Sequence, residues 1–438
     1  MRYVVRNEFF GSLAYDKVEK DYIHLDHLAT RLLRNPDRRI SSTEYQEYGT
    51  DRGEVRLLRE ELKKRDLPGN SMYLANAVGQ KVLSAPTRIF LEITYQCPEK
   101  CAHCYTESGP RRPDELGLSE KKSIVDQMES MGCFRLSIAG GEPLVDPDFF
   151  PVVEHAISKD IDVSFSTSGI PVTERVARRL GELDVRTVNV SLDGWDDMSY
   201  DQVRGSGRFR YMLRGVERLR KHYHGKIAAK CTLMTSNIRN LDSIIALSEA
   251  LGFDVVKFNC VREAGRAIER NSLIPTQDEY IDSMRFLAEW YNSKKSKIKM
   301  VLPVNPYQKF EGDAPDVIGE LGFGCYAGKE SFCITATGSI QPCTSFGALK
   351  YVDGNVRGTR LIDAWNDGRA MNMFRGLNGS SACQSCPTYN GCRGGCYLRS
   401  FTATGDLNAT DPYCYEYRNL EPTAPKRLAR ELEVARAE

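Results

Sequence analysis

Three cysteines stand close together about a quarter of the way along this 438-residue chain. Cys97, Cys101 and Cys104 are separated by three and by two residues, and they follow the largely apolar run 88–96. A strand that ends in a loop with three thiolates is typical of a soft-metal site, for which iron–sulfur clusters and zinc are the candidates. A closed zinc site needs four protein ligands, whereas three thiolates on a cubane cluster leave one iron free. The loop therefore predicts a metal site that takes a further ligand, with a zinc knuckle completed by a distant fourth residue as the alternative.

The same loop resembles the signature of the radical S-adenosylmethionine (SAM) superfamily. The resemblance implies that Cys97, Cys101 and Cys104 hold a [4Fe–4S] cluster whose open iron chelates SAM. It also implies that the reduced cluster cleaves SAM to methionine and a 5′-deoxyadenosyl radical. An outside electron donor of the flavodoxin or ferredoxin type is then expected as a partner.

A glycine turn one structural unit further on strengthens this resemblance. Gly140, Gly141, Glu142 and Pro143 follow a candidate strand, and glycines let a backbone approach a ligand closely. A Gly-Gly turn alone is common, but its place after the cysteine loop matches the superfamily. There the turn contacts the amino group of SAM.

Further polar residues match the superfamily at the ends of later candidate strands. The resemblance implies SAM contacts for Ser166 and Ser191, a loop-organising role for Asp193, a charge-assisted pair between Arg204 and the SAM carboxylate, and stacking of His103 near the adenine. An ordinary turn and a surface ion pair are the alternatives for Asp193 and Arg204.

Strand and helix patterns alternate from residue 86 to residue 305, which predicts parallel βα units. The expected strands are 90–94, 135–139, 162–166, 187–192, 228–232 and 255–259. The expected helices between them are 119–131, 149–158, 173–183, 211–221 and 241–251. The fold class is thus α/β, and six units resemble a partial (β/α)6 TIM-type barrel, whose chemistry lies at the carboxyl ends of the strands. Cys133, Cys231 and Cys260 fall in or beside these elements and are expected to be buried small hydrophobic residues.

Residues 1–85 form the predicted N-terminal domain and contain no cysteine. Strand patterns near residues 4–15 and 22–25 precede helical patterns at 27–34 and 55–64, and the segment 41–44 has the form of a capping box. This order resembles the winged-helix peptide-recognition element of the PqqD type. The resemblance implies that a precursor peptide adds its leader to the edge of the hairpin. A structural cap and a nucleic-acid-type winged helix share the pattern.

A second group of cysteines occupies the predicted C-terminal domain, residues 325–420, after a bridging region at 306–324 and before a tail at 421–438. Its members are Cys325, Cys333, Cys343, Cys383, Cys386, Cys392, Cys396 and Cys414. The spacing resembles the SPASM domain, which holds two auxiliary [4Fe–4S] clusters, so the chain is expected to carry three clusters in all. Two zinc sites fit the same number of thiolates.

The resemblance also implies how the ligands are shared. Cys325, Cys333, Cys343 and Cys396 would hold auxiliary cluster I, and Cys383, Cys386, Cys392 and Cys414 would hold auxiliary cluster II. Cys333 lies outside the usual seven-cysteine pattern, so its ligation decides whether cluster I is closed. Thr344 stands where sulfatase-maturing members carry an aspartate, which argues against that activity.

The composition of the chain limits the classes of protein to which it can belong. The formal net charge is +1, without the basic excess of a dedicated nucleic-acid binder. No signal peptide or long apolar run is visible, so we expect a cytoplasmic chain without a membrane span. Fourteen cysteines in such a chain favour metal ligation over disulfides.

These features together resemble enzymes that mature ribosomally made peptides (RiPP maturases), and the C-terminal half resembles mycofactocin maturases. The resemblance implies oxidative modification of a precursor peptide by a thioether or carbon–carbon cross-link or by oxidative decarboxylation. The alternative is an enzyme of the same kind that acts on a non-peptide substrate, such as a tetrapyrrole or a metal-cofactor precursor.

Overall fold

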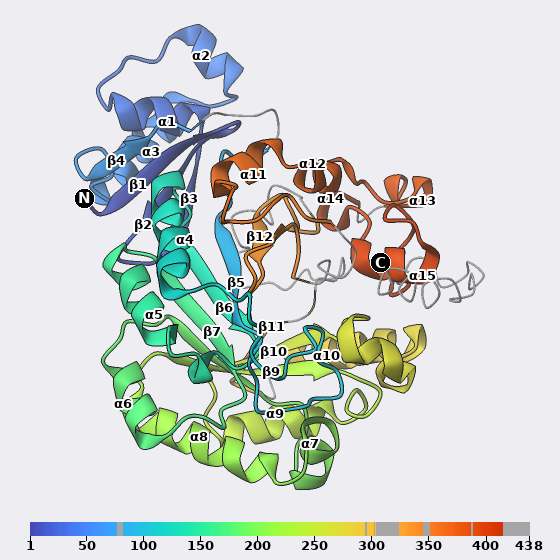
Figure 1. The fold of residues 1–438 in the computed structure, drawn as a ribbon. Coiled ribbons are helices and arrows are strands. Elements are labelled where there is room, and N and C mark those ends of the chain that lie inside the picture. The colour runs from blue at the N-terminus through green and yellow to red at the C-terminus, as the bar shows by residue number, and fades with distance from the viewer. Residues whose placement is uncertain are drawn as a thin grey trace.

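The structure is a computed structural model that describes residues 1–76, 82–293, 296–301, 303, 324–344, 351–386 and 389–414. It contains a four-stranded sheet near the N-terminus and a nine-stranded sheet that forms the body of the molecule (Figure 1). The predicted bridging region, apart from Gly324, and the predicted tail lie outside the described residues. Within the described residues, no helix has the length and apolar character needed to cross a bilayer.

The N-terminal sheet has the strand order β3-β2-β1-β4. Its elements are β1 (Tyr3–Glu8), β2 (Gly11–Asp16), β3 (Asp21–Asp26), α1 (His27–Arg34), α2 (Ser42–Glu47), α3 (Arg52–Lys64) and β4 (Ser71–Leu74). The first three strands are antiparallel, and β4 returns to lie parallel to β1. The predicted capping box is present, because Ser41 and Glu44 each bond the other's backbone at the start of α2. The sequence patterns missed β4.

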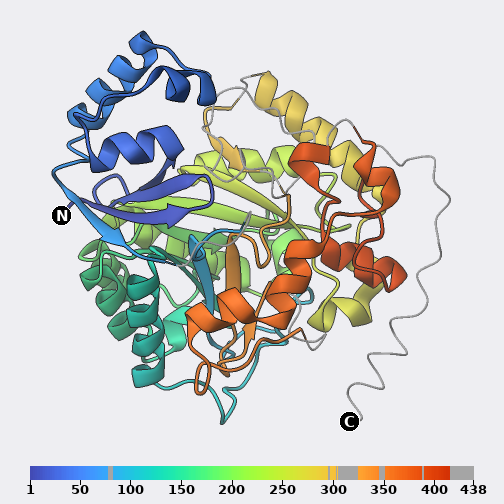
Figure 2. The ribbon, with the colours of Figure 1, turned by 90° about the horizontal axis from the view of Figure 1, so that it is seen from above.

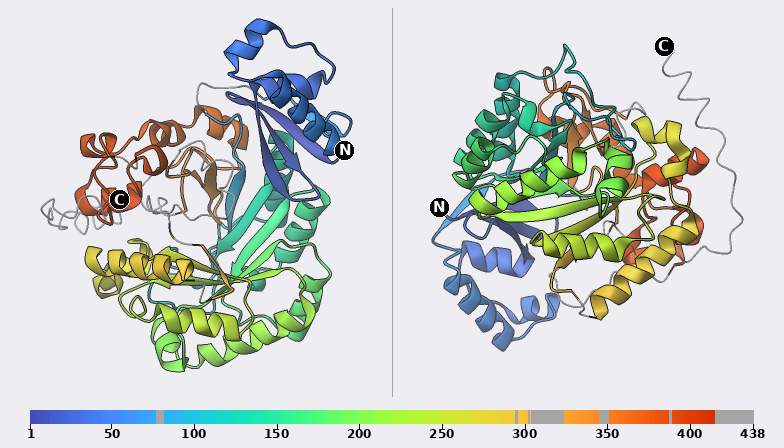
Figure 3. Two further views of the ribbon diagram at one scale, coloured as in Figure 1. Left: turned by 180° about the vertical axis from the view of Figure 1, so that it is seen from behind. Right: turned by 90° about the horizontal axis from the view of Figure 1, so that it is seen from below.

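The two faces of this small sheet have different neighbours, since side chains alternate along a strand. Tyr3 and Val5 pack with the helices of the N-terminal region. Val4 and Tyr15 face the large sheet and belong to its core, where the ring of Tyr15 stacks on Phe134 at 4.8 Å. The N-terminal region is thus packed onto one end of the large sheet (Figures 1 and 3).

A buried guanidinium reinforces that junction. Arg6 is 2% exposed, and its Nε donates to Glu8 Oε1 at 2.7 Å. Its two other nitrogens donate to the backbone carbonyls of Ala85, Pro86 and Gly132 at 2.6–2.9 Å. One side chain therefore joins the first strand of the chain to two separate segments of the large sheet's core.

The large sheet has the strand order β11-β10-β9-β8-β7-β6-β5-β12-β13. Its first eight strands in that order are parallel, and the strands from β5 to β10 match the six predicted ones. They are β5 (Arg88–Thr94), β6 (Arg135–Gly140), β7 (Asp162–Thr167), β8 (Thr187–Ser191), β9 (Lys226–Leu233), β10 (Val255–Cys260) and β11 (Lys299–Val301).

The connecting helices run along the outer face of the sheet (Figure 1). They are α4 (Leu118–Met131), η1 (Pro143–Val145), α5 (Phe149–Ser158), α6 (Glu174–Gly181), α7 (Asp197–Arg204), α8 (Arg208–His222), α9 (Leu241–Ala250), η2 (Gly265–Leu273) and α10 (Gln277–Asn292). Five of these match the helices expected between the six strands, and α10 matches a further helical pattern at 276–291; the short polar helix α7 was not expected. The parallel α/β fold is confirmed, but the sheet extends beyond six units on both sides.

The extension beside β5 comes from the cysteine-rich C-terminal region. Strand β12 (Ser331–Ile334) pairs parallel to β5 and antiparallel to β13 (Ile340–Gln341). The helices that follow are α11 (Leu361–Asp367), α12 (Arg369–Gly376), α13 (Ser381–Gln384), α14 (Tyr389–Cys392) and α15 (Tyr397–Thr404). Trp365 is fully buried and donates to the carbonyl of Leu83, which ties α11 to the sheet's core. From above, these helices lie on the side of the molecule away from the N-terminal sheet (Figure 2).

Replacing Arg6 by methionine should destabilise the whole molecule. The change keeps most of the side-chain volume but leaves Glu8 and three carbonyls without their donor, and breaking a buried ion pair costs about 3–5 kcal/mol. Urea unfolding measures the loss. The matched control is Arg56→Met, because Arg56 is an exposed residue of α3 in a surface ion pair. Equal unfolding midpoints for the two variants would contradict this account of the junction.

Candidate active site

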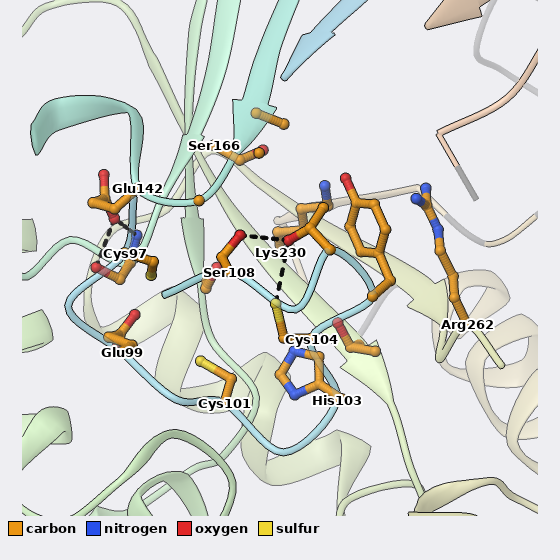
Figure 4. A pocket seen from close by; sticks show the side chains of 18 of the residues that line it. Cys97, Glu99, Cys101, His103, Cys104, Ser108, Glu142, Ser166, Lys230 and Arg262 are labelled. Atoms are coloured by element: carbon orange, nitrogen blue, oxygen red, sulfur yellow. Dashed lines mark hydrogen bonds between the residues drawn. The ribbon is translucent and has the colours of Figure 1, made fainter. Parts of the chain in front are cut away.

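The three cysteines of the first loop line a cavity of about 210 Å³ at the carboxyl ends of the sheet strands (Figure 4). Residues from successive strand ends surround it, as expected for parallel βα units. Of the predicted site residues, those on the cavity wall are Cys97, Cys101, Cys104, His103, Gly140, Gly141, Glu142, Ser166, Ser191 and Arg204. Pro143 and Asp193 are buried and are absent from this wall.

Backbone bonds hold the cysteine loop in place. The amide of Ala102 donates to the carbonyl of Val203 in α7 at 3.0 Å. On the other side, the amide of Arg266 donates to the carbonyl of Cys104, and its side chain donates to the carbonyls of Cys101 and Ser108 at 2.9 Å. Two elements that the sequence patterns did not identify, α7 and η2, therefore position the loop.

Arg204 connects the cysteine loop to the end of β8. Its Nε donates to Asp193 Oδ2 at 2.6 Å, and its Nη1 lies 3.7 Å from the carboxylate of Glu99, which stands between the first two cysteines. All three side chains are buried. Burial alone would raise the pKa of Asp193, yet the positive charge of Arg204 holds this pKa below its ordinary value. Asp193 also accepts the amide of Thr232 in β9, so the pair links three strand ends.

His103 is neutral in this setting. Burial lowers the pKa of its imidazole to about 4, although the carboxylate of Asp193 lies 3.6 Å from Nε2. Its Nδ1 is buried and has no hydrogen-bond partner among the described residues. A neutral ring on the cavity wall fits the expected stacking surface, and the free nitrogen can bond a bound molecule.

The glycine turn lies against the start of the cysteine loop. Gly140 has a φ of 111°, and a Cβ on Gly141 would lie 2.2 Å from the carbonyl oxygen of Gln96. Only glycine permits this contact without moving the backbone. The amide of Glu142 also donates to Gln96, so the turn and the loop share one wall of the cavity.

The carboxylate of Glu142 is already bonded to the next strand end. It accepts from Thr167 Oγ1 at 2.8 Å and from the amide and hydroxyl of Ser168 at 2.7 and 2.8 Å. Glu142 therefore fixes the relative positions of β6 and β7 at the cavity.

A second cavity of about 300 Å³ adjoins the first and is lined by Cys325, Cys343 and Cys396. These three cysteines pack against one small apolar cluster around Phe374 and Tyr397. The two cavities share Phe90, Asn259, Cys260, Arg262 and Thr344. The structure thus brings the first cysteine loop and part of the second cysteine group to neighbouring spaces.

Cys333 lies deeper, in β12, with no exposed surface. Burial raises the pKa of its thiol, and the negative charges of Glu92 and Cys343 nearby add to this rise. Cys260 corrects an expectation: it is half-buried and lines both cavities, whereas Cys133 and Cys231 are core residues as predicted.

The donor set fits iron–sulfur clusters. All fourteen cysteines are free thiols. Burial raises the pKa of Cys97 to about 12 and that of Cys101 to about 11, so both become thiolates only beside a strong positive centre such as a metal. Within the part of the chain that the structure describes, no group of three His, Cys, Asp or Glu side chains is close enough to hold a single ion. The thiolates of a cubane bind different irons and lie farther apart.

Replacing Arg204 by methionine should both destabilise the protein and weaken SAM binding. The variant leaves Asp193 and Glu99 buried without their counter-charge, at a cost of about 3–5 kcal/mol. Chemical unfolding and equilibrium dialysis with SAM measure the two effects. Arg239→Met is the control, since Arg239 forms an exposed pair with Glu279. Unchanged SAM affinity in a folded R204M protein would remove Arg204 from the site.

Known proteins share these features. Residues 91–246 match the radical SAM superfamily, and residues 325–387 match the SPASM iron–sulfur cluster-binding domain. The chain is 31% identical over 340 residues to mycofactocin maturase MftC of Mycolicibacterium smegmatis, across 77% of this chain and 84% of the relative. It is 27% identical over 349 residues to AdoMet-dependent heme synthase of Oleidesulfovibrio alaskensis, across 77% and 89%.

The fold matches that of Streptococcus suis SuiB. The SuiB structure bound to S-adenosylmethionine has a TM-score of 0.70 and 17% identity, with 94% of this chain and 99% of that chain covered. The structure of SuiB bound to precursor peptide SuiA has the same TM-score at 15% identity, with 94% and 97% covered. The chain therefore belongs to the radical SAM superfamily, as an enzyme that carries a SPASM domain.

Proposed function

We propose that this enzyme cleaves SAM and uses the resulting radical to modify a ribosomally made precursor peptide. The observation that carries the proposal is the similarity to mycofactocin maturase, which spans 77% of this chain and 84% of that relative. The modification is a thioether or carbon–carbon cross-link or an oxidative decarboxylation. The fourteen free cysteines suit the reducing cytoplasm.

The residues of the first cavity would hold the cofactors. Cys97, Cys101 and Cys104 would ligate one cluster, and the two groups of four C-terminal cysteines, led by Cys325 and Cys383, would ligate the auxiliary clusters. Bound there, the first cluster would supply the electron for the cleavage of SAM, and the auxiliary clusters would supply acceptors for the electron that the product gives up. A flavodoxin or ferredoxin would be the electron donor.

The chain's own side chains perform the remaining tasks. The backbone of Gly140 and Gly141 packs directly against the start of the cysteine loop, and Arg204 keeps that loop against the end of β8. Ser166 and Ser191 present hydroxyls on the cavity wall. The cavity lies between the strand ends and Thr344 of the C-terminal region, and a substrate that fills it would exclude water, which protects a carbon radical from side reactions.

The N-terminal sheet supports a peptide substrate. Its order leaves β3 at an edge, paired only with β2 among the described strands, and an extended peptide can add to such an edge by backbone hydrogen bonds. SuiB, whose fold this chain shares over 94% of its length, has been crystallised with its precursor peptide. We infer that residues 1–85 bind the leader of the precursor.

A non-peptide substrate is the second candidate, and one observation favours it. The heme synthase relative is 27% identical across 89% of its own length, which nearly equals the coverage of the maturase. The N-terminal sheet would then serve as a cap on the end of the large sheet.

Co-expression with peptides tests the proposal directly. Where a short open reading frame beside the gene encodes the precursor, we expect the mass of its peptide to fall by about 2 Da for a cross-link, which removes two hydrogen atoms, or by about 46 Da for an oxidative decarboxylation, which removes carbon dioxide and two hydrogen atoms. Mass spectrometry measures the change, with Cys97/Cys101/Cys104→Ala as the inactive control. Conversion of a tetrapyrrole, with every peptide unchanged, would favour the second candidate.

Iron analysis tests the cluster assignment. Anaerobically reconstituted enzyme should bind about twelve irons, and the triple alanine variant about eight with no 5′-deoxyadenosine after dithionite and SAM, because each cubane holds four irons. Cys333→Ser should lower the iron content if Cys333 closes cluster I, whereas the core variant Cys231→Ser should not. An iron content near four in the wild type, or zinc in place of iron, would contradict the auxiliary clusters.

A further inference from the structure

Two cations stand on the wall of the first cavity outside the set that the motifs identified. Lys230 comes from the middle of β9, and Arg262 follows the end of β10 (Figure 4). Arg262 also lines the second cavity, so it stands where the two spaces meet. Neither residue is needed to hold the cysteine loop, which Arg204 and Arg266 position.

Lys230 lies near the carboxylate of Asp193, which is already bonded to Arg204. Lys230 makes no hydrogen bond or ion pair with any residue in the described part of the chain, although it is half-buried. Burial and the nearby positive charges of Arg262 and Lys257 lower the pKa of its amine to about 8.

Arg262 is held in place but keeps free donors. Its Nη1 donates to the hydroxyl of Thr344, and its guanidinium lies over the ring of Tyr105 at 4.4 Å. A guanidinium has five N–H donors, of which the described hydrogen bonds use one. Stacking and one anchor fix the plane of the group, which favours recognition of a planar anion.

The acidic residues on the wall of the first cavity interact with residues other than Lys230 and Arg262. Glu142 accepts bonds from Thr167 and Ser168, and Glu99 lies against Arg204. Lys230 and Arg262 are therefore cations that face the cavity with no carboxylate of the described chain bound to them.

We propose that Lys230 and Arg262 form a binding site for a carboxylate of the substrate. The inference rests on the proposed function and adds the substrate class: the group presented to the radical carries, or lies next to, a free carboxylate. A peptide would supply it from its C-terminus or from an acidic side chain. Lys230 lines the first cavity and Arg262 lines both cavities, so a carboxylate held by the two would lie near the place where the cavities meet.

SAM itself carries a carboxylate, so the test must separate the two sources. The probes are N-acetyl-L-alanine and its amide, N-acetyl-L-alaninamide, which match in size and differ in charge. Each is titrated by NMR into the anaerobically reconstituted holoenzyme with SAM bound. A charge-assisted contact predicts that the acid binds about tenfold more tightly than the amide.

Variants of Lys230 then test whether this residue causes the preference for the acid over the amide. Lys230→Met should lower the affinity for N-acetyl-L-alanine to that for its amide. The variant should lose more affinity for N-acetyl-L-alanine than for SAM. Lys230→Arg should keep the preference. Lys221→Met is the matched control, because Lys221 is exposed on α8 and pairs with Glu174. The comparison of the two probes on the wild type needs no variant to fold.

Three results would overturn the site. They are equal or absent binding of the two probes to the wild type, an unchanged preference in Lys230→Met, and a loss of SAM affinity in that variant as large as the loss for the acid. The last result would assign the carboxylate to SAM. Formation of 5′-deoxyadenosine by the wild type without either probe tests the proposed function separately, so the two failures can be told apart.

Discussion

The ion pair between Arg204 and Asp193 joins segments that the sheet alone would leave independent. A parallel sheet fixes the positions of its strands, but the loops at their carboxyl ends have no ladder of their own. Here a buried guanidinium bonds an aspartate after β8 and lies beside Glu99 in the cysteine loop. The three thiols of that loop can bind one cluster only if the loop holds a single conformation. The chemistry therefore depends on the pair of Arg204 and Asp193, although neither residue is bonded to a thiol.

The same dependence on neighbouring strand ends recurs around the cavity. Glu142 bonds the turn after β7, Asp193 bonds the amide of Thr232 in β9, and Arg266 bonds the loop after β5. Each tie is local and connects one βα unit to another. The cavity wall is thus held together by hydrogen bonds between neighbouring βα units. The order of the strands in the sheet decides which residues lie close enough to form these bonds.

Much of this arrangement could be predicted from the sequence. Apolar runs and amphipathic stretches located the strands from β5 to β10 and most of their helices, because burial on both faces or on one face leaves a clear pattern. Cysteine spacing, together with Gly140 and Gly141, identified the loop and its turn, because these residue types have few other uses in such a pattern. The radical SAM and SPASM assignments followed from the same residues and are confirmed.

Other parts of the site carry no local signal. Arg266 and Lys230 are ordinary cations in the sequence, and their roles depend on what lies opposite them in space. The helix α7 is short and polar, and β4 has four residues, so neither produces a strong periodicity. Cys260 resembles Cys133 and Cys231 in sequence, yet one more step along a strand moves it from the core to the cavity.

The pairing of β12 with β5 has a consequence for synthesis on the ribosome. Thr87 and Glu330, which bond each other beside this pair of strands, are 243 residues apart. Until the C-terminal region emerges, one edge of β5 has no partner, and an open parallel edge is prone to pair with other chains. During synthesis, one edge of β5 therefore stays unpaired until the cysteine-rich region has been made. That region then supplies β12, which pairs with this edge and covers it. Any truncation before residue 331 would leave that edge permanently exposed.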